Sequence, residues 1–408
     1  MERIVVVGAS LAGLRACEAL RAAGYGGTIT VIGAERHLPY DRPPLSKALL
    51  RGDWEPDRIH LRKPAELDGL DLDLRLGTAA VALDVTGRTV ALDTGEALGG
   101  DGVIIATGSS PRRLPNQPDL DGVMMLRTLD DSLALRDRLA EHPRVVVIGA
   151  GFIGLEVTAT AARSGCAVTV LEGAPAPMMR GLGAEMGEIV ARVHARNGVE
   201  IRCGVLVDGI EGSGGRVTGV RLGGGELVAA DVVVVGIGVA PTTEWLDNSG
   251  LQLGDGVICD ESLRAAPGIY AAGDCARWTN PLFGEAGEVM RVEHWTNAAE
   301  QGAAAASNLL AELAGTAATP YSPVPFFWSD QFDSRIQFVG RAHGGDEVRM
   351  VAGHADGNLV ALYAHGGRFR GVLGVNMPKL VMPYRKLLAE RASWDQVVHY
   401  ATEATQQS

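Results

Sequence analysis

Two runs of consecutive β-branched residues, each followed directly by a glycine-rich turn, divide this sequence into repeating patterns. The runs cover residues 4–7 and 145–148, and the turns read GASLAG and GAGFIG. Uninterrupted apolar runs of this length are typical of parallel strands that are buried on both faces. Each turn leads into an alanine-rich segment with helical periodicity, and further apolar runs follow at 28–32 and 167–171. The pattern predicts two strand–helix–strand units in an α/β fold.

The second turn, at residues 149–154, has the spacing of a dinucleotide-binding loop. Gly149 allows a tight turn, Gly151 a close approach of a pyrophosphate to the backbone, and Gly154 close packing of helix on strand. The following helix start offers free N–H groups to phosphates. Glu172 ends the next strand, where a ribose hydroxyl needs an acceptor. A purely structural turn with a solvated Glu172 is the alternative, but the coincidence of both features favours a nucleotide site.

The first turn is a less regular copy, because Ser10 stands where the second glycine is expected. A serine fits there if the backbone keeps its usual conformation, although it leaves less room for a phosphate. Glu35, after the second strand, is the available ribose acceptor in this copy. Two such units in one chain indicate two bound nucleotides.

Both nucleotide units continue in the same way, which indicates a duplicated plan. Residues 77–105 predict a β-meander that ends in a buried strand and glycine turn, and a second such strand and turn lie at 231–241. A proline-rich linker at 319–325 then opens a third region. We expect strands there at 326–329, 335–339, 359–364 and 371–375, and a closing helix with Leu380, Arg385 and Leu388.

Composition narrows the possible functions. A chain of 408 residues is long enough for two or three domains, and 46% hydrophobic with 21% charged residues is ordinary for a globular protein. The longest apolar runs are too short to span a membrane, and a net charge of −12 argues against a nucleic-acid partner. The five cysteines form no C-x-x-C pair, so we expect no metal site. Because a strand follows Met1 without a signal peptide, we expect a cytoplasmic location.

Two further stretches carry candidate chemistry. Residues 39–47 form a stiff loop with three prolines, in which Arg42 and Lys47 either neutralise phosphates or lie against an electron-rich ring; a rigid surface loop with solvated cations is an equal alternative. Asp274 follows a short buried strand. It is either the N-cap of the next helix or an acceptor for a ribityl or ribose hydroxyl.

The motifs in this order resemble one known family, the oxygenase-coupled NADH-dependent ferredoxin reductases, which include putidaredoxin reductase and the reductases of biphenyl-type dioxygenases. The resemblance covers essentially the whole chain. It rests on GASLAG at 8–13, PYDRPPLSK at 39–47, ATG at 106–108, GAGFIGLE at 149–156, GIGVAP at 236–241, AAGD at 271–274, EHW at 293–295 and FWSDQ at 327–331.

The resemblance implies two Rossmann-like dinucleotide-binding domains of the glutathione-reductase type and a smaller α+β interface domain. FAD would bind to residues 1–110 and 242–319, NADH to 111–241, and the interface domain would be 320–408. The implied FAD residues are Gly8, Ala12, Gly13, Arg42, Lys47, Ala80, Arg127, Asp274 and Trp295. Glu35 is our substitute acceptor, because the family often has an acid where Ala34 stands.

For NADH, the resemblance implies contacts to Gly149, Gly151, Ile153, Gly154, Glu156, Glu172 and Gly238. The implied catalytic residues are Lys47, Glu156, Trp295 and Trp328, with both tryptophans close to the isoalloxazine ring. Lys47 would stabilise negative charge on the reduced flavin. A contact to a phosphate or an ion pair with Glu156 is the alternative role for Lys47.

The implied reaction transfers a hydride from NADH to FAD and then single electrons to a [2Fe-2S] or related ferredoxin. That ferredoxin would supply a cytochrome P450 or a ring-hydroxylating dioxygenase. Glu172 repels the 2′-phosphate of NADPH, and no Arg stands at 173 or 174, so the sequence predicts a preference for NADH. An acidic ferredoxin needs a local basic patch. Its candidates are Arg291, Arg335, Arg368, Arg370, Lys379, Arg385 and Lys386.

Three other classes of function share parts of this pattern. Disulfide reductases need a redox cysteine pair, and the first helix has only Cys17 while the 39–49 loop has no cysteine. An apoptosis-inducing-factor-like flavoprotein, in which NADH mainly changes partner binding, is a second possibility. A rubredoxin reductase is the third.

Overall fold

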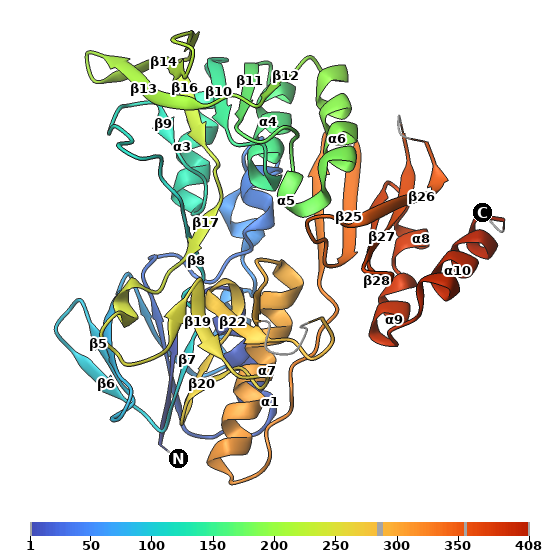
Figure 1. Ribbon diagram of the computed structural model, residues 1–408. Helices are drawn as coiled ribbons and strands as arrows, with labels where there is room; N and C mark the ends of the chain where they lie inside the picture. The colour runs from blue at the N-terminus through green and yellow to red at the C-terminus, as the bar shows by residue number, and fades with distance from the viewer. Residues whose placement is uncertain (1, 284–288, 355–356, 407–408) are drawn as a thin grey trace. The chain divides into compact units, whose positions relative to one another are not determined.

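The computed structural model describes residues 2–283, 289–354 and 357–406, shown in Figure 1. The chain forms two compact units. Unit 1 consists of Met1–Asp41, Ile59–Ser110 and Ala240–Pro325, and unit 2 of Arg42–Arg58, Pro111–Val239 and Phe326–Ser408. The chain passes from unit 1 to unit 2 within β8 (Ser109–Pro111) and returns within β17 (Val239–Pro241).

Unit 1 is built on a six-stranded sheet in the order β20-β21-β7-β1-β2-β3. The apolar run at residues 4–7 forms β1, which pairs in parallel with β2 and β7 as the pattern predicts. The strands are β1 (Arg3–Val7), β2 (Thr28–Gly33), β3 (Leu72–Leu76), β7 (Gly102–Ile105), β20 (Arg264–Ala266) and β21 (Ile269–Ala271).

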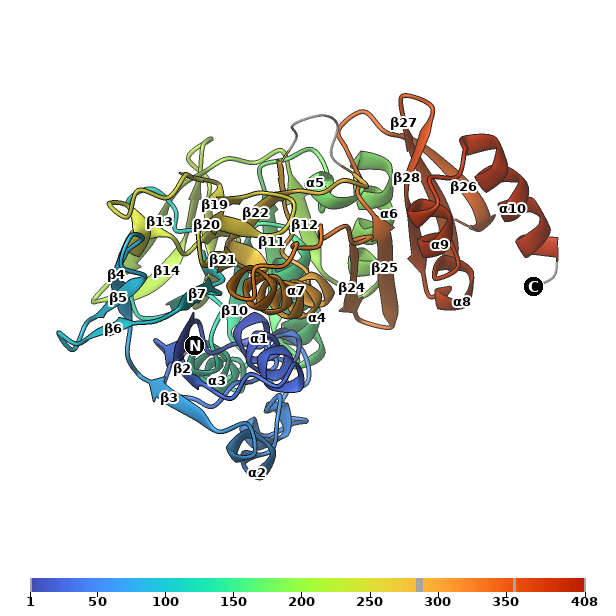
Figure 2. The same cartoon turned by 90° about the horizontal axis from the view of Figure 1, so that it is seen from below.

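Two long helices of unit 1, α1 (Leu11–Ala22) and α7 (Trp295–Leu313), pack side by side (Figure 2). A Cβ on Gly302 of α7 would lie 2.1 Å from the carbonyl oxygen of Ala12, so only glycine allows this close approach. The contact fixes the start of α1, and with it the first glycine turn, against α7.

Smaller elements complete unit 1. The predicted meander at 77–105 is confirmed as an antiparallel sheet that precedes β7. These elements are β4 (Ala80–Asp84), β5 (Thr89–Leu92), β6 (Ala97–Gly99), β18 (Leu253–Gly254), β19 (Gly256–Cys259), β22 (Ala276–Thr279), β23 (Val289–Arg291), α2 (Pro64–Asp68), η3 (Glu244–Leu246) and η4 (Gly273–Cys275), with η2 (Pro56–Ile59) at the boundary of the units.

Unit 2 contains the second nucleotide-type sheet, which is parallel throughout in the order β12-β11-β10-β16-β9. The second meander, β13-β14-β15, comes directly before β16. These elements are β9 (Val123–Met124), β10 (Arg144–Ile148), β11 (Ala167–Glu172), β12 (Glu200–Cys203), β13 (Val207–Ser213), β14 (Arg216–Leu222), β15 (Leu227–Ala229), β16 (Val232–Val235), η1 (Pro43–Ser46), α3 (Leu129–Leu139), α4 (Phe152–Arg163), α5 (Met179–Leu182) and α6 (Ala184–Arg196).

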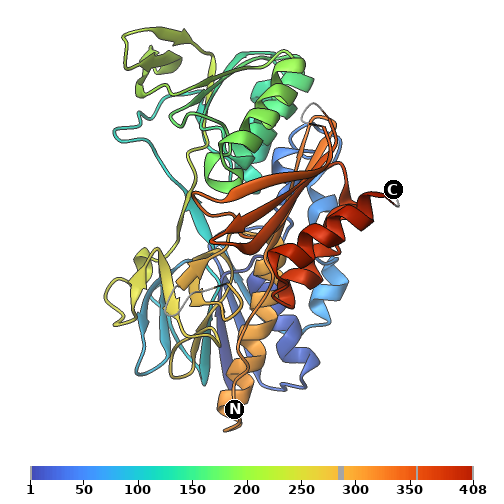
Figure 3. The same ribbon diagram turned by 45° about the vertical axis from the view of Figure 1, so that its right-hand side comes forward.

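The C-terminal part of unit 2 is an antiparallel sheet in the order β24-β25-β28-β27-β26, against which three helices pack (Figure 3). All four predicted strands are present. They are β24 (Phe326–Gln331), β25 (Ser334–Gly340), β27 (Leu359–His365) and β28 (Arg368–Val375), joined by β26 (Glu347–Gly353) and by α8 (Pro378–Val381), α9 (Tyr384–Ala389) and α10 (Trp394–Gln406).

Two expectations for this region were incomplete. The pattern did not predict β26, because its side chains are only partly buried at the edge of the sheet and lack a strict apolar alternation. The single closing helix is also wrong. Pro383 separates α8 from α9, because proline has no N–H to donate within a helix, and α10 follows as a third helix.

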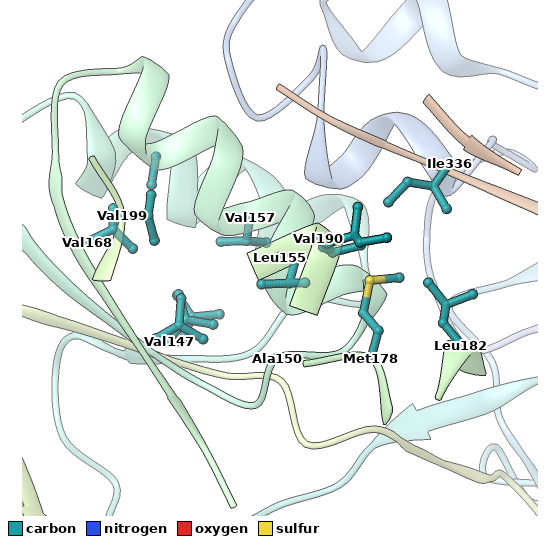
Figure 4. Packing of buried hydrophobic residues seen from close by; sticks show 14 of the residues in the cluster. Val147, Ala150, Leu155, Val157, Val168, Met178, Leu182, Val190, Val199 and Ile336 are labelled. Atoms are coloured by element: carbon teal, nitrogen blue, oxygen red, sulfur yellow. The ribbon is translucent and has the colours of Figure 1, made fainter. Parts of the chain in front are cut away.

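One hydrophobic core joins the parallel sheet of unit 2 to the C-terminal sheet. Val147 of β10, Leu155 of α4, Val190 of α6 and Ile336 of β25 belong to the same buried cluster (Figure 4). The C-terminal sheet is therefore anchored on α6 and on α4, the helix that follows the second glycine turn. Within the described ranges, no helix has both the length and the apolar composition needed to cross a lipid bilayer.

Candidate functional site

The glycine turn between β10 and α4 has the three constraints that its spacing predicts. Gly149 has φ +102°, and a Cβ there would lie 2.4 Å from the Gly236 carbonyl oxygen. A Cβ on Gly154 would lie 2.2 Å from the Gly149 carbonyl oxygen. By contrast, a Cβ on Gly151 would meet nothing within 4 Å. Protein packing does not require glycine at 151, so the open space there fits a phosphate that approaches the backbone.

Glu172 is held at this turn by its carboxylate. Its Oε2 accepts a hydrogen bond from the Ala150 N–H at 2.7 Å, and its Oε1 accepts one from the Ala174 N–H at 2.8 Å. The half-buried side chain is thereby aimed at the loop rather than into solvent. Ile153, in the first turn of α4, is 48% exposed, and Gly238 has φ +97° with open space at its Cβ position. These features leave room for a ligand beside the turn.

Glu156 lies one turn along α4 and is the centre of a buried polar cluster. It is only 3% exposed. Its Oε2 accepts hydrogen bonds from Ser46 Oγ at 2.6 Å and from Lys47 Nζ at 2.5 Å, and its Oε1 accepts one from Ser329 Oγ at 2.6 Å. Three donors from two distant segments therefore hold this carboxylate.

The proline-rich loop is fixed against the helices of unit 2. Thr160 Oγ1 of α4 donates to the Ser46 carbonyl oxygen at 2.7 Å, and Ser132 Oγ of α3 donates to the Leu45 carbonyl oxygen at 2.7 Å. Arg42 Nη1 donates to the Arg127 carbonyl oxygen at 2.6 Å. The loop is therefore a rigid platform that presents Lys47, and the alternative of an ion pair with Glu156 is present in the structure.

The first glycine turn, in unit 1, has the same two strict positions. Gly8 has φ +124°, and Cβ atoms on Gly8 and Gly13 would lie 2.1 Å and 1.9 Å from the carbonyl oxygens of Ala106 and Gly8. Ser10 occupies the position equivalent to Gly151 with an extended backbone that suits any residue. Ser10 therefore does not distort the turn.

Two carboxylates of unit 1, Glu35 and Asp274, follow strands β2 and β21 of the sheet that carries this turn. Tyr40 donates its hydroxyl proton to Glu35, and Ser109 Oγ donates to Asp274 Oδ2 at 2.8 Å. Trp295 begins α7 and donates from Nε1 to Asp41 Oδ1 at 2.6 Å. The carboxylates of Glu35 and Asp274 are the kind of acceptor that ribose and ribityl hydroxyls need.

Comparison with known families identifies this architecture. Residues 2–302 match the model described as pyridine nucleotide-disulphide oxidoreductase, and residues 326–404 match the one described as reductase C-terminal. The chain belongs to the pyridine nucleotide-disulphide oxidoreductase family. It is an oxidoreductase that uses FAD and NAD(P)H, and the two glycine turns fit two dinucleotides.

The relatives of this oxidoreductase are similar over nearly their full length. Rhodocoxin reductase from Rhodococcus erythropolis is 40% identical, over 95% of this chain and 89% of that protein. The ferredoxin–NAD(+) reductase component of the anthranilate 1,2-dioxygenase system from Burkholderia cepacia is 38% identical, over 96% and 95%. The reductase in the covalent putidaredoxin reductase–putidaredoxin complex has a TM-score of 0.90 and 32% identity, over 100% and 99%.

The oxidoreductase has no redox disulfide, although its family is named for one. All five cysteines, Cys17, Cys166, Cys203, Cys259 and Cys275, are free. Burial raises the pKa of the Cys17 thiol to about 12, so it is a poor nucleophile. The five cysteines therefore form no disulfide, as the sequence indicated. Direct release of electrons from the flavin stays a prediction.

The structure distributes the predicted site residues over both units. Unit 1 holds Gly8, Ala12, Gly13, Glu35, Ala80, Asp274 and Trp295, whereas unit 2 holds Arg42, Lys47, Arg127, Trp328 and the complete predicted NADH set, which includes Ile153, Glu156 and Gly238. Contact of the two groups with one flavin stays a prediction. Trp328 of β24 lies 6.0 Å from Phe326 between ring centroids, and the Arg335 guanidinium lies 6.0 Å from its ring.

Sequence reasoning missed one part of the oxidoreductase site, the side chains beyond Glu156. Ser329 donates to Glu156, Gln331 to Ser329, and His194 of α6 contacts Gln331. In the sequence FWSDQ is visible only as a motif, and no local spacing connects it with His194. The signal available was the presence of polar residues in a segment that reads as a buried strand.

A second polar cluster was also missed, at the loop before β26. His343, Asp346 and His365 place potential ligand atoms within 4.8 Å of one another. Asp346 already accepts hydrogen bonds from the His343 N–H at 2.6 Å and from His365 Nδ1 at 3.1 Å. These bonds tie the loop to His365 at the end of β27.

Proposed function

We propose that this chain is an NADH-dependent ferredoxin reductase that supplies electrons to an oxygenase. The observation that carries the proposal is the similarity to ferredoxin reductases over the whole chain, including the reductase C-terminal region. The free cysteines support direct transfer from flavin to the partner. Bound FAD supplies the chemistry, since it accepts a hydride and releases electrons singly.

The residues of unit 2 support the assignment of NADH to the second glycine turn. Gly151 leaves the backbone open for the pyrophosphate, and the carboxylate of Glu172 is positioned to accept from a ribose hydroxyl. The same negative charge repels a 2′-phosphate, so we propose NADH rather than NADPH. Ile153 offers an exposed apolar surface beside the turn.

Lys47 and Glu156 have a positional role in this proposal. Their ion pair places one cation and one fixed carboxylate beside the start of α4, where they orient the nicotinamide end of NADH and exclude water. Trp295 and Trp328 are proposed to border the flavin ring. The division into FAD residues 1–110 and 242–319, NADH residues 111–241 and an interface domain 320–408 belongs to the same proposal.

The proposed partner is an acidic ferredoxin, with a [2Fe-2S] cluster and a cytochrome P450 or ring-hydroxylating dioxygenase downstream. Exposed cations of the C-terminal region support a docking role, namely Arg335, Arg368, Lys379 and Lys386. Arg291 is a poor candidate, because it is 10% exposed and pairs with Asp255 and Glu293. We also propose a cytoplasmic location, where NADH is available and thiols stay reduced.

Stopped-flow spectroscopy under anaerobic conditions tests the proposal. We expect NADH to bleach the flavin absorbance rapidly, and cytochrome c reduction to depend on added ferredoxin. Slow bleaching with a long-lived charge-transfer band would contradict electron transfer as the function and favour a binding flavoprotein. Reduction of rubredoxin in preference to ferredoxin would contradict the proposed partner.

A further inference from the structure

A continuous chain of polar side chains runs from the NADH-type turn into the C-terminal sheet and on to α6. Lys47 Nζ and Ser329 Oγ contact Glu156 at 2.5 Å and 2.6 Å. Gln331 Nε2 lies 3.1 Å from Ser329 Oγ, and Gln331 Oε1 lies 2.9 Å from His194 Nε2. All these residues belong to unit 2.

The hydrogen bonds in this chain have only one consistent direction. The Ser329 hydroxyl has a single proton, and it must lie toward Glu156, because a carboxylate can only accept. The Ser329 oxygen then accepts from the Gln331 amide N–H, which leaves the amide oxygen to accept from His194. His194 therefore donates from Nε2, and every bond in the chain points toward Glu156.

His194 at the far end is suited to be a neutral donor. Its Nδ1 is buried and has no hydrogen-bond partner among the described residues. A proton on that atom would be desolvated without an acceptor, so Nδ1 stays unprotonated. Burial also lowers the pKa of His194, while the bond to Gln331 opposes this shift.

Such a chain is costly in a hydrophobic core. Ser329, Gln331 and His194 are each 0% exposed, and their neighbours include Met178, whose sulfur lies 3.8 Å from Gln331 Nε2. Apolar residues of similar size usually stabilise a core at least as well as a buried polar network does. A fully satisfied network instead specifies one arrangement of its members.

We propose that Ser329 and Gln331 are positioning residues for the Lys47–Glu156 pair, with His194 as the terminal donor. Ser329 occupies Oε1 of Glu156, so Oε2 stays directed toward Lys47 and Ser46. The C-terminal sheet thereby sets the orientation of the polar groups beside the NADH turn. This inference rests on the proposed function, in which that turn holds NADH.

Rapid kinetics on the FAD-loaded full chain test the inference. With Ser329→Ala we expect flavin reduction at saturating NADH to slow by on the order of tenfold, since this is the usual worth of a hydrogen bond to a charged group. The NADH dissociation constant should change by less than about twofold, because the glycine turn is untouched. Ser334→Ala, which removes a different buried hydroxyl from the same sheet, is the matched control. NADH should reduce the flavin of this variant at the wild-type rate.

A double-mutant cycle separates positioning from general loosening of the core. Gln331→Leu alone should slow reduction, but it should add nothing further in the Ser329→Ala background, since Gln331 acts only through Ser329. Additive effects of the two substitutions on the reduction rate would contradict a role of Gln331 that acts through Ser329. His194→Gln retains a donor and should stay near wild type, whereas His194→Leu should resemble Gln331→Leu.

The tautomer of His194 gives a readout that does not depend on turnover. Two-bond ¹H–¹⁵N correlations should show a neutral imidazole with its proton on Nε2, and Gln331→Leu should perturb these signals. An Nδ1–H tautomer would contradict the proposed direction of the hydrogen bonds from His194 to Glu156. A wild-type reduction rate in Ser329→Ala would refute the inference while leaving the proposed function intact. If NADH fails to reduce the wild-type flavin, the proposed function fails instead. If Ser329→Ala does not fold, the flavin reduction rates of His194→Gln and His194→Leu test the inference instead.

Discussion

Nζ of Lys47 lies 2.5 Å from Oε2 of Glu156, and the two residues come from segments 109 positions apart in the chain. Glu156 is 3% and Lys47 17% exposed, so breaking the pair leaves a poorly solvated charge. We expect Lys47→Met to lower the free energy of unfolding by about 1–3 kcal/mol. It should also slow flavin reduction and weaken the charge-transfer absorbance with NADH.

The double variant Lys47→Met/Glu156→Gln is the control for this prediction. It removes both charges, so it should be more stable than Lys47→Met alone. Urea denaturation of the three proteins measures the difference. Unchanged hydride transfer and charge-transfer absorbance in Lys47→Met would show that Lys47 has only a structural role.

Cofactor choice should depend on Glu172. Its carboxylate accepts from the backbone N–H groups of Ala150 and Ala174, and this places a fixed negative charge at the turn. We expect a clear preference for NADH, and Glu172→Ala should raise kcat/KM for NADPH relative to NADH by about tenfold or more. Comparable wild-type kcat/KM values for the two cofactors would contradict this assignment.

Two glycines of the same turn should respond oppositely to alanine. A Cβ on Gly151 meets nothing within 4 Å, whereas a Cβ on Gly154 lies 2.2 Å from the Gly149 carbonyl oxygen. Gly151→Ala should keep the wild-type Tm and raise the KM for NADH, because the methyl group occupies the space open to the pyrophosphate. Gly154→Ala should lower Tm or prevent folding. Thermal unfolding with steady-state kinetics distinguishes them, and an unchanged KM in Gly151→Ala would place the pyrophosphate elsewhere.

Stability should fall in mild acid because of buried histidines. Burial lowers the pKa of His194 below its ordinary value of 6.5, and burial lowers the pKa of His294 to about 4 against the opposing charge of Asp274. Below pH 6.5 the unfolded chain therefore binds protons that the folded chain resists, and the free energy of unfolding decreases as pH falls. Denaturant titrations between pH 7.5 and 5 measure the slope. His194→Gln should make it shallower, and an unchanged slope would mean that folding does not shift the pKa of His194.

Docking of the ferredoxin should be sensitive to salt. The chain has a net charge of −12, so attraction of an acidic partner depends on local cations such as Arg335 and Lys379. We expect the KM for ferredoxin to rise as ionic strength increases, because salt screens these charges. Arg335→Ala should raise that KM at low salt. Arg75→Ala, an exposed arginine of unit 1, is the control, and a flat salt response would contradict electrostatic docking.

The local pattern of residues was sufficient to predict the nucleotide units. Runs such as 145–148 became parallel strands, and the turn at Gly149–Gly154 has the strict and open positions that its spacing indicates. The constraint on Gly154 is local, because the blocking carbonyl oxygen belongs to Gly149, whereas Gly149 is constrained by the distant Gly236. The spacing still predicts both positions, because a strand–turn–helix unit repeats the same turn geometry wherever it occurs. The position of Glu172 at the turn follows from the same short register of β10 and β11.

Tertiary packing alone decided which distant side chains meet. Lys47, Ser329 and His194 come together with Glu156 and Gln331 only because η1, α4, α6 and β24 pack in one unit, and separations of 109, 173 and 137 residues carry no periodic signal. The same reason explains why the pattern did not predict β26 and α10. β26 is the edge strand of the C-terminal sheet and α10 packs against β26 and β28, and no local periodicity indicates these contacts. The sequence alone therefore predicted the two glycine turns as nucleotide sites, whereas long-range packing decided how the polar groups beside the second turn are held.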